Sequence, residues 1–156
     1  MVQTLTTQIE IAAPPEVVRS VFLDFDRFKE WHPSWLSIAV VDPAKRPADL
    51  QPKDVLKVGL KTYYFNPTVV ENTPSCFSWL GNLYGILLGT HQFHFKPSEQ
   101  TPGGTTLVQK EDFAGAIAFM FRSGWSAAKS TGGNFEQFNQ DLKAAAEKVA
   151  RQAGQQ

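Results

Sequence analysis

A histidine and a glutamate occupy positions that strand alternation predicts to face an apolar interior. Residues 89–95 read Gly-Thr-His-Gln-Phe-His-Phe, and successive residues of a strand point to opposite faces, so His91 shares a face with the phenylalanines. On the returning stretch 105–113, the same alternation puts Glu111 with Gln109. Burial of an unpaired ionisable group is costly, so His91 and Glu111 are predicted to bond to each other, to water or to a ligand.

Such a pair could act in acid–base chemistry. A carboxylate beside an imidazole orients the ring and favours its protonated form, which suits His91 to transfer protons with Glu111 as the orienting carboxylate. The alternative is that the same pair only fixes the register of two strands. Gln109, on the face of Glu111, could donate a hydrogen bond to a ligand carbonyl or satisfy a neighbouring group.

The elements that must position these residues follow from local patterns. Strands are predicted at Leu5–Ile11, Leu36–Val41, Val55–Tyr64, Pro67–Thr73, Cys76–Leu80, Leu87–Phe95 and Thr105–Phe113, separated by proline- and glycine-containing turns. Two short helices are predicted between Pro15 and Pro33, because apolar residues recur there at helical spacing with a break at Asp24.

A long or kinked helix is predicted to close the chain. Apolar residues recur at helical spacing from Ile117 to Val149, and Gly132-Gly133 interrupts the stripe. Residues 1–150 are expected to form one domain, and the polar tail 151–156 is expected to fray.

The composition argues against several classes of protein. Fifteen basic residues balance 15 acidic ones, so the chain has no net charge to attract a nucleic acid, and no binding to nucleic acid is expected. No stretch is apolar enough for a membrane span or a signal peptide, which predicts a cytoplasmic protein with no integral membrane association. The 12 phenylalanines and 4 tryptophans are equally compatible with a ligand cavity and with a solid aromatic core.

Metal and cofactor sites are not predicted. The single Cys76 excludes an internal disulfide and any multi-cysteine metal site. His91 and His94 differ in strand parity, so they should face opposite ways, and no metal is expected. Residues 129–133 lack the strand and the spacing of a phosphate-binding loop.

Taken in order, these elements describe an α+β domain in which a curved antiparallel sheet wraps a long C-terminal helix, the helix-grip plan. The chain resembles the START-like superfamily called SRPBCC, in its polyketide cyclase/dehydratase-like branch. The resemblance covers nearly the whole chain and lies in the opening 9–18 and 24–33, in 89–95 and 103–105, and in 111–115 with 135–142.

What the resemblance implies is a hollow between sheet and terminal helix that takes a hydrophobic small molecule, aromatic or polyketide-like. The residues expected to contact it are Trp35, Tyr63, Trp79, Phe93, Gln109, Phe113, Phe121, Trp125, Phe135 and Phe138. Trp35 could form an aromatic gate with Trp31 and His32 or pack the small helices on the sheet. Only one of Tyr63 and Tyr64 can point inward from a single strand.

Three functions stay open at this point, because a shared fold does not choose between them. The chain could catalyse a cyclisation, dehydration or isomerisation with His91 and Glu111, with Tyr63 or Gln109 donating to a carbonyl. It could carry or sense a lipid or metabolite without catalysis. It could be an interaction protein with a filled core. A monomer or a homodimer is expected.

Overall fold

The computed structural model describes residues 2–61 and 63–155. Its elements are β1 (Gln3–Ile11), α1 (Pro15–Leu23), the 3₁₀ turn η1 (Phe25–Arg27), α2 (Phe28–Trp31), β2 (Leu36–Val40), η2 (Pro47–Asp49), β3 (Leu56–Leu60), β4 (Tyr63–Phe65), β5 (Thr68–Thr73), β6 (Cys76–Leu83), β7 (Leu87–Pro97), β8 (Thr105–Ala114), η3 (Ala118–Phe121) and α3 (Ser126–Gly154).

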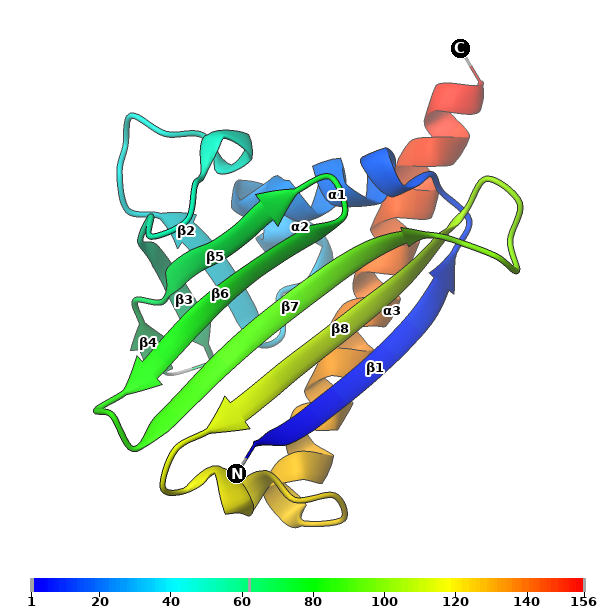
Figure 1. The fold of residues 1–156 in the computed structure, drawn as a ribbon. Coiled ribbons are helices and arrows are strands. Elements are labelled where there is room, and N and C mark those ends of the chain that lie inside the picture. The colour runs from blue at the N-terminus through cyan, green and yellow to red at the C-terminus, as the bar shows by residue number, and fades with distance from the viewer. Residues whose placement is uncertain (1, 62, 156) are drawn as a thin grey trace.

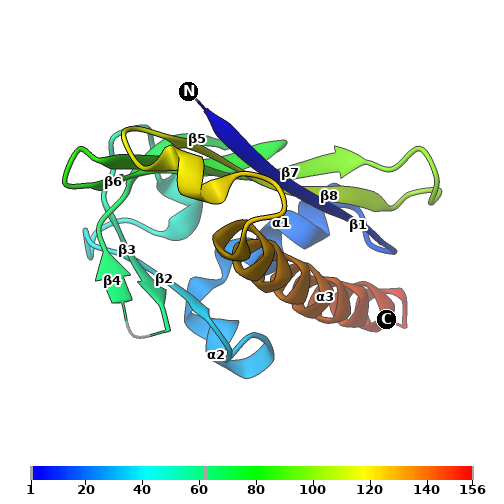
Figure 2. The same ribbon diagram turned by 90° about the horizontal axis from the view of Figure 1, so that it is seen from below.

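Two antiparallel sheets surround the long helix α3 (Figures 1 and 2). The larger has the strand order β1-β8-β7-β6-β5, and the smaller has the order β2-β3-β4. In Figure 2 the large sheet forms the upper layer, α3 runs beneath it, and the small sheet lies beside α3. This arrangement confirms the predicted helix-grip plan, including the two short helices after the first strand.

Aromatic packing fills one part of the space between these layers. Phe22 of α1 is fully buried and touches the rings of Phe77, Phe93 and Phe95 on the sheet and Phe138 on α3, with ring centroids between 4.5 and 6.3 Å apart. Rings of this kind bury large apolar areas and pack edge to face, so this cluster joins α1, the sheet and α3. In this part of the interior the aromatic residues therefore form a solid core rather than the wall of a cavity.

The terminal helix begins later than its apolar stripe predicts. Gly115 and Gly124 have φ of 104° and 86°, a backbone region that favours glycine and ends helical geometry. The segment between them forms only the short η3, and α3 starts at Ser126. Gly132-Gly133 does not interrupt α3, which is continuous from Ser126 to Gly154.

Two further boundaries differ from the predictions. The stretch 55–64 is divided into β3 and β4 by a turn in which Lys61 has φ of 58°, and residue 62 lies outside the described residues. The helix α3 extends to Gly154, into the tail 151–156 whose fraying stays a prediction, and residue 156 is outside the described residues.

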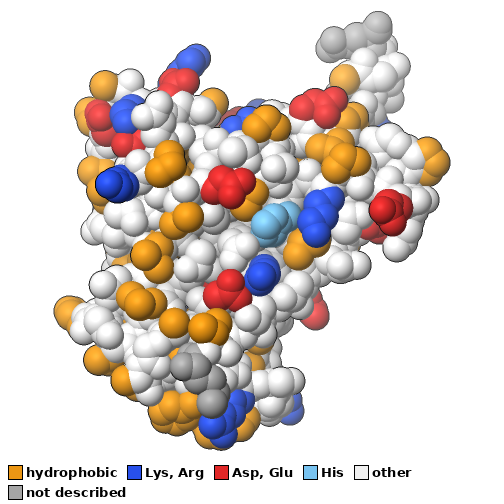
Figure 3. Space-filling view, in the orientation of Figure 1, with side chains coloured by type: hydrophobic (Ala, Val, Ile, Leu, Met, Phe, Trp, Pro, Cys, Tyr) orange, Lys and Arg blue, Asp and Glu red, His pale blue; other side chains and the backbone are white. Residues whose placement is uncertain are grey.

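The outer face of the large sheet carries charges of both signs among apolar side chains (Figure 3). His94 lies on this face and contacts Gln92 at 3.0 Å, away from His91, as their parity predicts. Among the described residues, no helix is long and apolar enough to cross a membrane.

Candidate functional site

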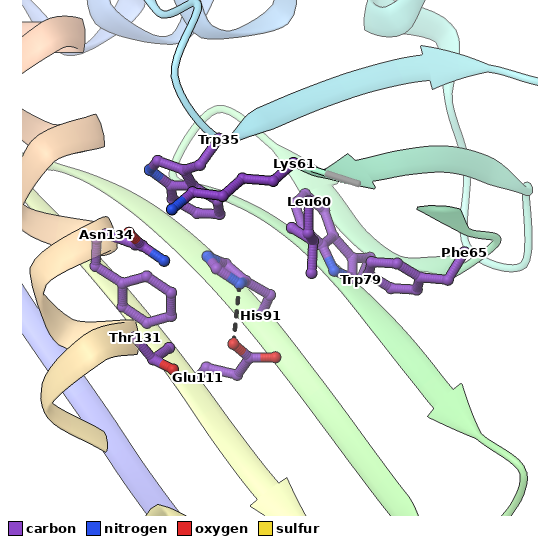
Figure 4. A pocket seen from close by; sticks show the side chains of 10 residues that line it. Trp35, Leu60, Lys61, Phe65, Trp79, His91, Glu111, Thr131 and Asn134 are labelled. Atoms are coloured by element: carbon purple, nitrogen blue, oxygen red, sulfur yellow. Dashed lines mark ion pairs between the residues drawn. The ribbon is translucent and has the colours of Figure 1, made fainter. Parts of the chain in front are cut away.

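His91 and Glu111 lie directly opposite each other on β7 and β8. Their side chains meet on the inner face, where His91 Nδ1 is 3.2 Å from Glu111 Oε2 (Figure 4). The His91 side chain is only 5% exposed and that of Glu111 is 16% exposed, so the carboxylate is the more accessible partner. The contact agrees with the bonding predicted from strand parity.

Aromatic rings fix the plane of the imidazole. His91 stacks on Trp79 of β6 at 4.9 Å and on Phe93 at 4.7 Å, and Phe135 of α3 meets its face at 4.8 Å and 61°. Trp79 and His91 are paired across β6 and β7, which explains the stacking. The ring therefore has no room to turn away from Glu111.

A buried amide fixes which nitrogen of His91 carries a proton. Gln109 Nε2 donates to the main-chain oxygen of Phe135 at 3.2 Å and to Asn139 Oδ1 at 2.8 Å. A main-chain oxygen only accepts hydrogen bonds, so this pattern assigns the amide nitrogen of Gln109 to that side and its Oε1 to His91 Nε2, 2.9 Å away. His91 Nε2 must then carry the hydrogen.

The second ring nitrogen of His91 faces the carboxylate. His91 Nδ1 lies 3.2 Å from Glu111 Oε2, which is close enough for an ion pair when the imidazole is protonated. An ionised carboxylate has only acceptors, so a hydrogen on Nδ1 would favour this contact.

The pair opens on a cavity made of two adjoining chambers. The first, about 170 Å³, is lined by Trp35, Leu60, Lys61, Phe65, Trp79, His91, Glu111, Thr131, Asn134 and Phe135. The second, about 240 Å³, is lined by Leu60, Tyr63, Phe65, Gly81, Asn82, Leu83, Leu87, Gly89, Glu111, Phe113, Phe121 and Thr131. Glu111 belongs to both chambers, so its carboxylate lies where they meet.

Two glycines on facing strands make room in the second chamber. Gly81 and Gly89 are paired across β6 and β7. A Cβ on Gly89 would come within 2.6 Å of Glu111 Oε1, and one on Gly81 within 2.9 Å of the Phe65 ring. Glycine inside a strand often marks such a close approach. The two glycines are therefore the feature of the sequence from which this chamber could have been predicted.

The predicted ligand contacts divide into three groups. Trp35, Trp79 and Phe135 line the first chamber, and Tyr63, Phe113 and Phe121 line the second. Phe93 and Phe138 are fully buried in the aromatic core, and Trp125 is 45% exposed and packs on Phe119 and Arg122. Gln109 is fully buried with both N–H groups engaged, so it has no donor left for a ligand carbonyl.

Of the two tyrosines, Tyr63 lines the second chamber and Tyr64 lines neither chamber, although both are largely exposed after the turn that ends β3. The wall also uses residues that sequence reasoning missed, and among these Lys61, Thr131 and Asn134 have no distinguishing pattern in the sequence.

A second buried histidine lies behind Trp35. His32 is almost completely buried, and its Nδ1 is 2.7 Å from Asp141 Oδ2 on α3. Burial lowers the pKa of His32 below its usual value, and the hydrogen bond and charge of Asp141 oppose this shift only in part. His32 packs edge to face on Trp35 at 5.7 Å, so it supports the chamber wall rather than facing the chamber. Within residues 2–61 and 63–155, no cluster of three or more His, Cys, Asp or Glu side chains could hold a metal ion.

The curved sheet, the long helix and the apolar cavity between them define a START-like domain. More closely, the chain belongs to the family described as polyketide cyclase / dehydrase and lipid transport, whose model matches residues 2–147. This confirms the resemblance found in the sequence. A search of curated proteins gave no significant match.

Solved structures of the same fold include proteins of different activities. A START superfamily protein from Mycobacterium smegmatis has a TM-score of 0.68 and 16% identity, over 94% of this chain and 98% of its own. The Zhui aromatase/cyclase from Streptomyces sp. R1128 has a TM-score of 0.67 and 15% identity, over 99% of both chains. Norcoclaurine synthase from Thalictrum flavum has a TM-score of 0.66 and 7% identity, over 93% of this chain and 86% of its own. At these identities the likeness concerns the fold alone.

Proposed function

We propose that this chain binds a small aromatic, polyketide-like molecule in the two-chambered cavity and moves a proton on it with the His91–Glu111 pair. The observation that carries the proposal is a carboxylate that lies 3.2 Å from a buried imidazole and opens on an aromatic-lined cavity. Proton transfer next to a carbonyl is the step common to cyclisation, dehydration and isomerisation.

The roles of the two residues are the reverse of those first expected. Both ring nitrogens of His91 are engaged, one by Glu111 and one by Gln109, so neither is free to meet a ligand. Glu111 Oε1 instead lies over Gly89, at the junction of the chambers. Glu111 is therefore the proposed acid–base residue, and His91 is a positioning residue that holds its carboxylate.

In the proposed step, the Glu111 carboxylate removes a proton from the carbon next to the ligand carbonyl, and the electrons of the C–H bond form an enolate. The resulting carboxylic acid returns the proton to carbon or to the leaving hydroxyl. The aromatic walls exclude water from this exchange and hold a flat ligand by stacking. Of the two donors predicted for the ligand carbonyl, Tyr63 lines a chamber and Gln109 does not.

Deuterium exchange into α-tetralone, a flat aromatic ketone, tests the proton transfer without knowledge of the natural substrate. We expect the wild-type protein to accelerate exchange at the carbon next to the carbonyl, as followed by proton NMR. Glu111→Gln should reduce the acceleration by about 100-fold, a usual contribution of one general base. His91→Gln should change the pH profile of the exchange as well as its rate.

Asp112→Asn is the matched control. Asp112 adjoins Glu111 on β8 but faces outward, where it contacts Thr4 and Gln92, so its loss should leave the exchange unchanged. Equal rates for wild-type and Glu111→Gln protein would disprove the catalytic proposal.

A carrier without catalysis is the second candidate, and the near-complete burial of His91 favours it, since a buried pair also holds two strands together. Native mass spectrometry of freshly purified wild-type protein and extraction of any bound molecule separate the two. A bound aromatic or lipid molecule with no exchange activity in any variant would support the carrier.

A further inference from the structure

An indole N–H without a partner marks one end of the first chamber. Trp35 is 7% exposed and stacks on Phe135 at 6.2 Å. Its Nε1 is buried and has no hydrogen-bond partner among the described residues. Leaving a buried donor unpaired costs free energy, so this position favours an acceptor that a ligand brings in.

A lysine reaches the same end of the chamber. Lys61 projects from the turn between β3 and β4, and Figure 4 shows its ammonium beside Trp35, on the side of α3. Lys45, Lys110 and Lys143 each lie within 4.0 Å of a carboxylate, whereas Lys61 takes part in none of the ion pairs between described residues. Its charge is available to a molecule in the chamber.

Lys61 brings a positive charge to the Trp35 end of the chamber. His91, Glu111 and Lys61 are the titratable side chains of the first chamber. Lys61 is exposed, so its ammonium can meet an anionic group that enters from solvent. An anion at the Trp35 end would be attracted to Lys61 and would keep its distance from the Glu111 carboxylate.

We propose that the ligand carries an anionic oxygen, such as a carboxylate or an ionised enol, bound between the Lys61 ammonium and the Trp35 indole N–H. This inference rests on the proposed function, because it specifies the ligand class of the same cavity. The apolar body then extends past His91 toward Glu111, so the anionic group also decides which carbon faces the acid–base pair.

Two dyes that differ only in one anionic group test this inference. Anilinonaphthalene sulfonate carries an anionic head, and phenylnaphthylamine is the same aromatic body without it. Fluorescence titration gives a Kd for each dye. Lys61→Met keeps an unbranched side chain of nearly the same length and removes the charge. It should weaken binding of the sulfonate dye by about tenfold, with no change for the neutral dye. Trp35→Phe should weaken binding of the sulfonate dye by about fivefold, because the indole N–H is lost.

Lys57→Met is the matched control. Lys57 lies on β3, outside both chambers, with its ammonium 5.0 Å from the ring of Tyr64. This variant changes the net charge equally, so both dyes should bind as they do to the wild type. Lys61→Arg, which retains the charge, should keep most of the sulfonate affinity.

The outcomes separate this inference from the proposed function. If both dyes bind and Lys61→Met affects neither or affects both equally, the anion site is disproved while the aromatic cavity stands. If Lys57→Met weakens the sulfonate dye as much as Lys61→Met does, the effect is one of overall charge, and the anion site is again disproved. If neither dye binds to the wild type, the proposed binding function fails first.

Discussion

At the scale of single residues, the two buried histidines are held by different surroundings. His91 is enclosed by Trp79, Phe93 and Phe135 and is bonded at both nitrogens. His32 has one nitrogen bonded to Asp141, and its Nε2 is buried without a partner among the described residues. The second arrangement disfavours the protonated ring and lowers the pKa of His32.

The pH dependence of stability should therefore include a contribution from His32. Its pKa in the folded protein lies below the usual 6.5, because burial disfavours the charged form. The unfolded chain then binds more protons than the folded one, so stability is highest above the unfolded pKa and is lost as the pH falls through the folded pKa. Thermal unfolding between about pH 7 and pH 5 should show a falling Tm in the wild type and a smaller fall in His32→Gln.

His94→Gln is the comparison for this prediction. The pKa of His94 is also lowered by burial and by Lys96 and Lys110, but His94 lies on the outer face and is less buried than His32. His94 should therefore account for less of the fall in Tm with pH than His32 does. If Tm falls with pH as steeply in His32→Gln as in the wild type, His32 is not the source of this pH dependence.

The face on which a side chain lies could be predicted from the sequence where strand parity alone decides it. Parity placed His91 and Glu111 on one inner face, and the register pairs them directly. Parity could not reveal that the Gln109 amide donates hydrogen bonds to Phe135 and Asn139. Those partners come from α3, 26 and 30 residues further along the chain. Nor could it reveal Lys61, which enters the chamber only because a turn interrupts the strand predicted there.

At the scale of elements, α3 is continuous through the two glycines that interrupt its apolar stripe. A Cβ on Gly132 or on Gly133 would meet nothing within 4 Å. Each glycine thus lowers helix stability without serving a close contact, whereas packing of the Phe135 and Phe138 stripe against the sheet keeps the helix intact. The helical spacing of the apolar residues could be predicted from the sequence. That their packing would outweigh the low helix propensity of the two glycines could not.

Gly132→Ala and Gly133→Ala should each stabilise the protein. Alanine is favoured over glycine inside a helix by about 1 kcal/mol, which corresponds to a rise in Tm of about 3 °C for a chain of this length. Differential scanning calorimetry measures the change. Gly115→Ala is the contrast, because φ there is 104° and the new Cβ would come within 2.5 Å of the Ile86 main-chain oxygen. It should lower Tm, and a lower Tm for both helix variants would show that the glycines are needed in α3.

At the scale of the whole molecule, the single Cys76 reports on the opening of the large sheet. Its side chain is buried at the start of β6, between β5 and β7, and burial raises its pKa to about 11. A buried, protonated thiol reacts slowly with alkylating agents, so labelling requires the sheet to open. Iodoacetamide should label Cys76 rapidly in urea and slowly in native buffer, as read by mass spectrometry.

The control is a cysteine on the surface of the same protein. Ser123 lies in the exposed segment before α3, so Ser123→Cys in a Cys76→Ser background should be labelled equally fast with and without urea. Native labelling of Cys76 at the rate of this surface thiol would mean that β5 and β6 separate readily from the sheet. A ligand that closes the cavity should slow the labelling of Cys76 further.

The hydrogen bond from Gln109 to the main-chain oxygen of Phe135 connects the acid–base pair to the backbone of α3. A ligand bulky enough to lift α3 from the sheet would stretch this bond and release the amide to rotate by half a turn. Gln109 would then offer an N–H to His91, Nε2 would become the acceptor, and the hydrogen of a neutral ring would lie on Nδ1, where it would face Glu111 directly. Helix position would thus select the tautomer of His91, and ligand size would be passed on to the carboxylate of Glu111.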